Sequence, residues 1–206
     1  MGSVDRDRIR AAVGEILAAI GEDPAREGLR DTPRRVAELC GELFAGVGDD
    51  PADAFGGAFA LRDASSSADA DHGTDLHAAD RIGSVVLMRD LAFRSICEHH
   101  LLPFEGVVHV AYEPDAELAG LGRVAAVVEV ASSRPQLQER LGDDIADAVE
   151  RGLAARGVLV VIEARHGCVT ARGPRQTTSS TVTVSARGSL ADPAARAEVM
   201  ALVSRS

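Results

Sequence analysis

The sequence predicts an α+β protein in which two pairs of strands enclose a pair of helices and a helical segment comes first. Apolar side chains recur at helical spacing over residues 5–20 and 32–45, and again over 122–154. Residues 84–113 and 157–186 are β-rich and contain turn signals. Because adjacent strands with short turns pair antiparallel, we expect an antiparallel four-stranded sheet in the order ββααββ, with the helices on one face.

The first 60 residues are expected to form an N-terminal helical segment. Its first helix, over 5–20, carries one apolar stripe: Ile9, Val13, Ile16, Leu17 and Ile20. The second helix, over 32–45, begins favourably with Thr32 as the N-cap and Pro33 at the first helical position. Cys40 lies on the apolar stripe of this helix, so we interpret its thiol as a core group.

A flexible loop is predicted over residues 61–83, which are rich in Ala, Asp, Ser and Gly and have no periodicity. We interpret His72 and His77, which lie in it, as solvated histidines. The loop separates the helical segment, 1–60, from the domain predicted over 84–206.

The elements of this second domain follow from changes of period along the chain. They are strands over 84–96 and 105–113, helices over 122–132 and 135–154, strands over 157–170 and 178–186, and a short helix after Pro193. His109 alternates with valines in the second of these strands, and we interpret it as a structural histidine.

Composition excludes several functions. The 206 residues carry a formal net charge of −10 and the pI is near 5.0, so no nucleic-acid partner is expected. The chain has no lysine, which excludes Schiff-base chemistry. It has three cysteines, no apolar run long enough for a membrane span and no signal-peptide core at its start, so we expect a cytoplasmic protein without a membrane partner.

Cysteine and histidine residues form the most informative motif. Cys97 and His100 are three positions apart, close enough to bind one ion, and Cys168 would complete a Cys₂His set with an open fourth position. This set is typical of catalytic zinc, which activates water. His99 and His166 would remain free for proton transfer. From spacing alone, a Cys/His nucleophile and the absence of any site remain alternatives.

The strand predicted over 157–170 would place His166 and Cys168 at the site. Even-numbered side chains share one strand face, which begins apolar at Val158 and ends with His166, Cys168, Thr170 and Arg172. Such a face is typical of a core strand whose far end opens into a site.

Two other patterns are weaker. Residues 120–125 match the dinucleotide signature G-x-G-x-x-A, but no strand leads into them, so we reject that cofactor. A helix starting at Gly122 would still offer backbone N–H groups to a phosphate. Glu139 lies off the apolar stripe of its helix, so on pattern alone it is a solvated glutamate.

Taken together, four motifs closely resemble those of the GTP cyclohydrolase I family. They lie at 28–36, 97–104, 134–141 and 166–173, within a likeness that covers about residues 8–203. The resemblance implies a tunnelling fold (T-fold) and a toroidal homodecamer with its active sites at subunit interfaces. It implies hydrolysis of the guanine imidazole ring of GTP, giving formate and 7,8-dihydroneopterin triphosphate.

The resemblance also implies roles for ten residues of this chain. The implied zinc ligands are Cys97, His100 and Cys168. The implied proton-transfer residues are His99 and His166. Glu139 is implied to bind the guanine N1–H and amino group, with Gln138 beside it, which replaces the interpretation as a solvated glutamate. The implied triphosphate contacts are Arg35, Arg123 and Arg172.

The chain departs from the family pattern near Gly122. Family members usually have Gly-Leu-Ser-Lys and then, after two intervening residues, Arg, whereas this chain has Gly122, Arg123 and Ala126 at the last three of these positions. One hydroxyl and one cation of the triphosphate site are therefore absent, and Arg175 is a candidate to compensate. Two other functions follow as alternatives: ring opening of a guanine nucleotide with fewer phosphates, or a non-catalytic oligomer that binds a nucleotide or pterin.

Overall fold

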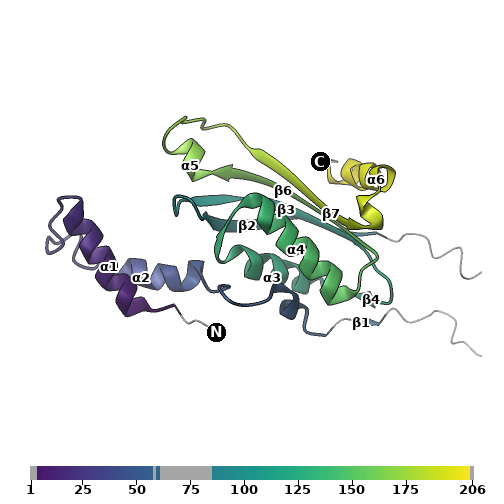
Figure 1. Ribbon diagram of the computed structural model, residues 1–206, viewed down its shortest axis with the longest axis horizontal. Helices are drawn as coiled ribbons and strands as arrows, with labels where there is room; N and C mark the ends of the chain where they lie inside the picture. Colours follow the sequence, from purple (N-terminus) through teal and green to yellow (C-terminus); the bar gives the residue numbers. More distant parts are fainter. Residues whose placement is uncertain (1–3, 58, 61–84, 205–206) are drawn as a thin grey trace, which may run out of the picture.

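The computed structural model describes residues 4–57, 59–60 and 85–204 (Figure 1). The predicted loop over 61–83, with its two histidines, lies outside the described residues. The helices are α1 (Arg6–Ala19), α2 (Thr32–Leu43), α3 (Leu121–Ser132), α4 (Gln138–Leu153), α5 (Gly167–Thr170) and α6 (Pro193–Val203), with 3₁₀ turns η1 (Pro51–Phe55) and η2 (Ser189–Ala191). The strands are β1 (Phe59–Ala60), β2 (Val86–Cys97), β3 (Pro103–Glu113), β4 (Glu117–Leu118), β5 (Pro135–Gln136), β6 (Gly157–His166) and β7 (Thr181–Gly188).

The main sheet has five strands in the order β5-β2-β3-β6-β7, so the prediction of a four-stranded antiparallel sheet was wrong in one respect. The four long strands are antiparallel, as expected. The fifth, β5, pairs parallel with the end of β2 through two residues only. Residues 135–136, predicted as helix, form this strand because they pair with the end of β2, where the Glu98 N–H donates to the Gln136 carbonyl at 3.1 Å.

Helices cover both faces of the sheet, not one. On one face, α4 packs on even-numbered side chains of β6, including Val158, Val160 and Ile162, all fully buried, and α3 packs on β2. The opposite face carries a smaller cluster in which Leu159 and Val161 of β6 join Leu190 and Val199 from η2 and α6. The strand period of two sends alternate β6 side chains into these two clusters, which makes β6 the most buried strand.

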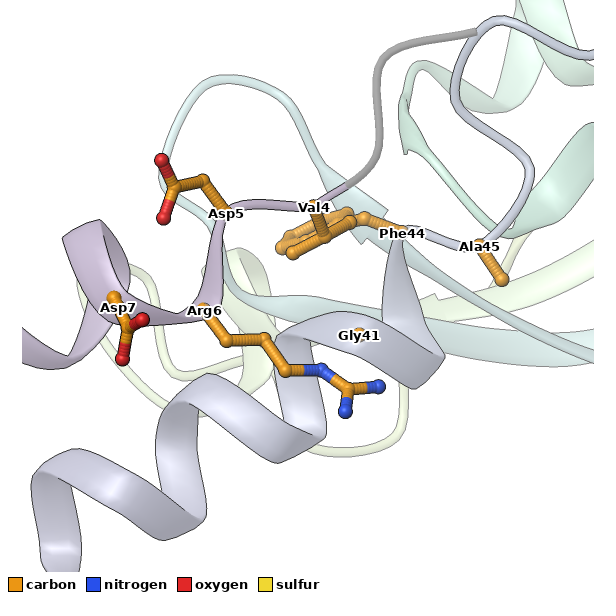
Figure 2. A pocket seen from close by; sticks show the side chains of 7 residues that line it. All are labelled: Val4, Asp5, Arg6, Asp7, Gly41, Phe44 and Ala45. Atoms are coloured by element: carbon orange, nitrogen blue, oxygen red, sulfur yellow. The ribbon is translucent and has the colours of Figure 1, made fainter.

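The N-terminal helices form a hairpin beside this layered body (Figure 1). α1 and α2 pack on each other, and neither buries much: α1 has no buried residue and α2 only Ala37. The side chain of Arg6 runs along α2 toward Gly41 (Figure 2), where an added Cβ would lie 2.7 Å from the guanidinium. Among the described residues, no helix has both the length and the apolar character that a membrane span needs.

The strand predicted to run to residue 170 ends at His166. Its partner β3 begins at Pro103, which has no N–H to donate, and the last cross-strand pair joins Phe104 to His166. The chain then turns into α5 at Gly167. The prediction that Cys168 and Arg172 extend the strand face of His166 was therefore wrong.

Candidate metal centre

The candidate site lies at the end of the sheet where β2 and β6 finish and β3 begins (Figure 1). A tight turn joins β2 to β3. In it, the Cys97 N–H donates to the Leu102 carbonyl at 2.8 Å, and the Leu101 N–H donates to the Cys97 carbonyl at 2.9 Å. Leu101 takes a left-handed φ of 52°. This turn brings His100 back toward Cys97.

Three potential metal ligands converge at this end. β6 runs antiparallel to β3, so its end lies beside the β2–β3 turn, and α5 carries Cys168 to the same place. The ligand atoms of Cys97, His100 and Cys168 all lie within 4.8 Å of one another. Two elements far apart in sequence therefore supply the Cys₂His set that the spacing predicted, although a helical turn and not a strand presents Cys168.

The chemistry of these donors fits a soft divalent cation. Burial raises the pKa of the Cys168 thiol, and the adjacent Cys97 raises this pKa further. Two neighbouring thiols are difficult to ionise together because the second charge lies beside the first. A cation between them removes this cost, and zinc favours a pair of thiolates with an imidazole.

The imidazole ring of His166 is contacted by Phe104 on one face and by Gln138 at one edge. Its ring stacks on Phe104 with centroids 4.8 Å apart and an interplanar angle of 3°. Its Nε2 lies 2.7 Å from the Oε1 of Gln138, at the start of α4. Burial lowers the pKa of His166, and the nearby Glu139 carboxylate partly opposes that shift. The imidazole is therefore neutral near pH 7, next to the metal ligands.

His99 and Glu139 complete the polar surroundings. His99 is exposed, and its ring meets the His100 ring edge to face at a centroid distance of 6.2 Å. Glu139 is exposed in the first turn of α4. Glu98, between Cys97 and His99, forms a bidentate ion pair with Arg140 at 2.6 and 3.2 Å. This pair ties the turn to the helix that carries Glu139.

The three predicted phosphate-binding arginines lie in different places. Arg172 is close enough to Cys168 to lower the pKa of its thiol. Arg123 is in the first turn of α3, and its guanidinium is 3.5 Å from the Ala54 carbonyl of η1. α3 has 12 residues and is about 18 Å long. Its C-terminal end, away from Arg123, is followed by β5, which pairs with Cys97. Arg35 lies on α2, 3.9 Å from Asp31. Neither of these two contacts joins Arg35 or Arg123 to a metal ligand.

Comparison with known proteins identifies the family. The family model described as GTP cyclohydrolase I matches residues 9–204. The GTP cyclohydrolase 1 of Leifsonia xyli subsp. xyli is 52% identical over 203 residues, which is 98% of this chain and 97% of that protein. The GTP cyclohydrolase 1 of Carboxydothermus hydrogenoformans is 48% identical over 202 residues, covering 97% and 95% of the two chains. The chain belongs to the GTP cyclohydrolase I family.

A less similar member of the GTP cyclohydrolase I family also aligns with nearly all of this chain. The Rhodopirellula baltica GTP cyclohydrolase 1 is 45% identical over 204 residues, covering 98% of this chain and 81% of that protein. Among solved structures, the archaeosine synthase QueF-Like in the apo form covers 52% of this chain with a TM-score of 0.43 and 17% identity. That similarity is too low to define the fold.

Sequence reasoning missed three contacts at the centre of this GTP cyclohydrolase I family member. They are the ring stacking of Phe104 on His166, the hydrogen bond from His166 to Gln138, and the ion pair of Glu98 with Arg140. The first had a sequence signal, since antiparallel pairing of the two strands opposes these rings. The other two depend on where α4 starts, which a periodic pattern does not specify within two or three residues.

Proposed function

We propose that this protein is a zinc-dependent GTP cyclohydrolase I that hydrolyses the guanine imidazole ring of GTP to formate and 7,8-dihydroneopterin triphosphate. The observation that carries the proposal is the convergence of Cys97, His100 and Cys168 in a chain of this family. The three side chains would hold the ion. Zinc bound there supplies a Lewis acid that activates water for attack near neutral pH.

His166 and His99 would transfer the protons of the reaction. Breaking a C–N bond of the imidazole ring requires protonation of the departing nitrogen and deprotonation of the attacking water. His166, which is half-buried and neutral near pH 7, suits the role of base. His99, which is exposed beside His100, is accessible to exchange its proton with solvent between turnovers.

Glu139 would select guanine. Its carboxylate can accept hydrogen bonds from the N1–H and the exocyclic amine at the same time. Adenine presents an acceptor at N1, so a carboxylate at this place leaves two acceptors facing each other. The exposed position of Glu139 in the first turn of α4, next to His166, leaves the carboxylate available to a substrate.

The triphosphate site would need more than one subunit. Arg172 lies near the metal ligands of its own chain, whereas Arg35 and Arg123 lie elsewhere, so neighbouring copies would supply them. A homo-oligomer, with ten subunits as the expected number, is supported by large apolar side chains that a single chain leaves exposed. They include Ile16 on α1, Ile20 at the C-cap of α1, Leu39 on α2, and Val182 and Val184 on the edge strand β7.

Turnover of GTP by the zinc-loaded protein tests the proposal. Purified protein is incubated with GTP, formate is measured, and the pterin is detected by its fluorescence after oxidation. Parallel assays with GDP, GMP and guanosine measure how much the triphosphate contributes to kcat/KM, given Gly122 and Ala126. The absence of formate with a metal-replete oligomer would contradict the function. A preference for GDP or GMP would contradict the choice of GTP as substrate.

A further inference from the structure

The amide of Gln138 is enclosed by protein. Only 1% of the residue is exposed, although its neighbour Glu139 is open to solvent. The side chain reaches from the start of α4 to the junction of β6 and β7. There, the amide nitrogen lies near three oxygens: the Ile162 carbonyl at 3.1 Å, the Thr181 carbonyl at 3.0 Å and the Thr183 hydroxyl at 3.1 Å.

These three oxygens fix the orientation of the amide. Two of them are carbonyls, which only accept hydrogen bonds, so the group that faces them must be the NH₂. Rotating the amide by 180° would place its own oxygen against both carbonyls and leave buried acceptors without donors, at a cost in stability. The Oε1 of Gln138 must therefore face the opposite side, where His166 lies.

The orientation of the amide in turn fixes the proton on His166. Its Nε2 is 2.7 Å from the Oε1 of Gln138, and a carbonyl oxygen has no proton to give. Nε2 must therefore carry the hydrogen. In the neutral ring the lone pair is then on Nδ1. Because the ring also stacks on Phe104, neither its plane nor its edge is free to change.

From this geometry we infer that Gln138 is a positioning residue, which holds His166 in the Nε2–H tautomer so that Nδ1 is the nitrogen that exchanges protons during the reaction. The inference rests on the proposed function for its catalytic consequence. It gives Gln138 a different role from the guanine contact that the family resemblance implied. A residue that orients a catalytic imidazole acts through it, without touching the substrate.

The tautomer can be measured without turnover. The protein is labelled with ¹⁵N-histidine, and solid-state NMR spectra are recorded at about pH 8.5, above the ordinary imidazole pKa of about 6.5. The His166 signals are assigned by their loss in His166→Ala. We expect a protonated Nε2 and a bare Nδ1 in the unsubstituted protein. A proton on Nδ1 would overturn the inference, whether or not the protein hydrolyses GTP.

Two matched substitutions separate positioning from packing. Gln138→Met keeps the length of the side chain but removes both ends of the amide. Gln136→Met does the same to a second glutamine that is 1% exposed and whose side chain donates to the Ala131 carbonyl and to Asp144, neither of which is a histidine. Both variants lose buried hydrogen bonds, but only the first loses a contact to His166.

For Gln138→Met we expect a mixture of His166 tautomers and a fall in kcat of about tenfold to a hundredfold, with KM for GTP unchanged. Gln136→Met should keep the tautomer and the kcat. A rise in KM at constant kcat in Gln138→Met would instead indicate a substrate contact and would overturn the inference, as would an unchanged tautomer. If the unsubstituted enzyme does not hydrolyse GTP, the proposed function fails while the NMR result still tests the orientation.

Discussion

At the scale of single residues, the centre separates the proposed cation ligands from the proposed proton-transfer groups. Cys97, His100 and Cys168 converge within 4.8 Å, whereas the Nε2 of His166 is already used by Gln138. His166 is not a member of the group of donors that lie within 4.8 Å of one another. The two sets should therefore respond differently to substitution.

Replacing one member of each set tests this division. We expect His166→Ala to retain zinc and to lose turnover by about a hundredfold or more, because a general acid–base group typically contributes that much. Cys168→Ser should lose the metal, because a hydroxyl is a far weaker ligand for zinc than a thiolate. Zinc content is measured by elemental analysis and its affinity by chelator competition. Equal loss of zinc in both variants would contradict the division.

Glu139 should control affinity for the base and not the chemistry. In Glu139→Gln one acceptor becomes a donor that faces a donor of guanine, so KM for GTP should rise about tenfold to a hundredfold, the equivalent of about 1.5–3 kcal/mol. Glu150→Gln, in the last turn of the same helix, is the control and should leave KM unchanged. Steady-state kinetics with zinc-replete protein measure both. An unchanged KM in Glu139→Gln would argue against guanine recognition by this carboxylate.

At the scale of elements, η1 is joined to α4 by an ion pair that sequence patterns do not reveal. Asp50 and Arg151 form two hydrogen bonds, of 2.8 and 2.9 Å, and the Arg151 guanidinium lowers the pKa of Asp50 from 3.8 to about 2. Asp50 also accepts a hydrogen bond from the Ala52 N–H at the start of η1. The aspartate thus caps one element and binds another.

The pair predicts a pH-dependent stability. Because folding lowers the pKa of Asp50, its contribution is complete above pH 4 and is lost as the pH falls through about 2. Asp50→Asn keeps the cap but removes the charge. We expect it to lower the free energy of unfolding at pH 7 by at most about 1 kcal/mol, since both side chains are substantially exposed. The difference from the unsubstituted protein should shrink between pH 4 and 2 in urea unfolding. A difference that is independent of pH would rule out the charge as its source.

Most elements could be predicted from the sequence because their periods are strong. The stripe from Leu141 to Leu153 and the alternation in β6 correspond to buried faces in the structure. Short elements could not be predicted: β5 has two residues, and α5 replaces the expected end of a strand because Pro103 ends the ladder. Convergence of the two cysteines was predicted from ligand chemistry, but the role of Gln138 depends on a tertiary contact that no local pattern contains.

At the scale of the whole molecule, the helical hairpin has an apolar surface that no other described part of the chain covers. Ile16 is 59% exposed and Ile20 is 68% exposed, although both belong to the predicted apolar stripe of α1. A stripe with helical period normally packs against another surface. If a second copy supplies that surface, substitutions there should affect assembly more than the stability of one chain.

The double substitution Ile16→Glu and Ile20→Glu tests this expectation. It should give smaller particles in sedimentation velocity and lose GTP turnover, because the arginines proposed to bind phosphate would no longer reach the neighbouring site. The ligands all come from one chain, so zinc should remain bound. Glu15→Ala, exposed on the same helix, is the control for helix stability. Particles of unchanged size in the double variant would refute assembly through this hairpin.

The separation of Arg123 from the cysteines along the length of α3 has a consequence for how such an enzyme diversifies. Under the proposed function, mutations between positions 122 and 126 would alter the binding of the nucleotide phosphates without disturbing the proposed metal ligands, because the two groups of residues lie at opposite ends of α3. Gly122 is an exposed example, where an ideal Cβ would meet no atom within 4 Å, so new side chains can be sampled there at little structural risk. The preferred nucleotide would then change while the ring-opening reaction stays the same.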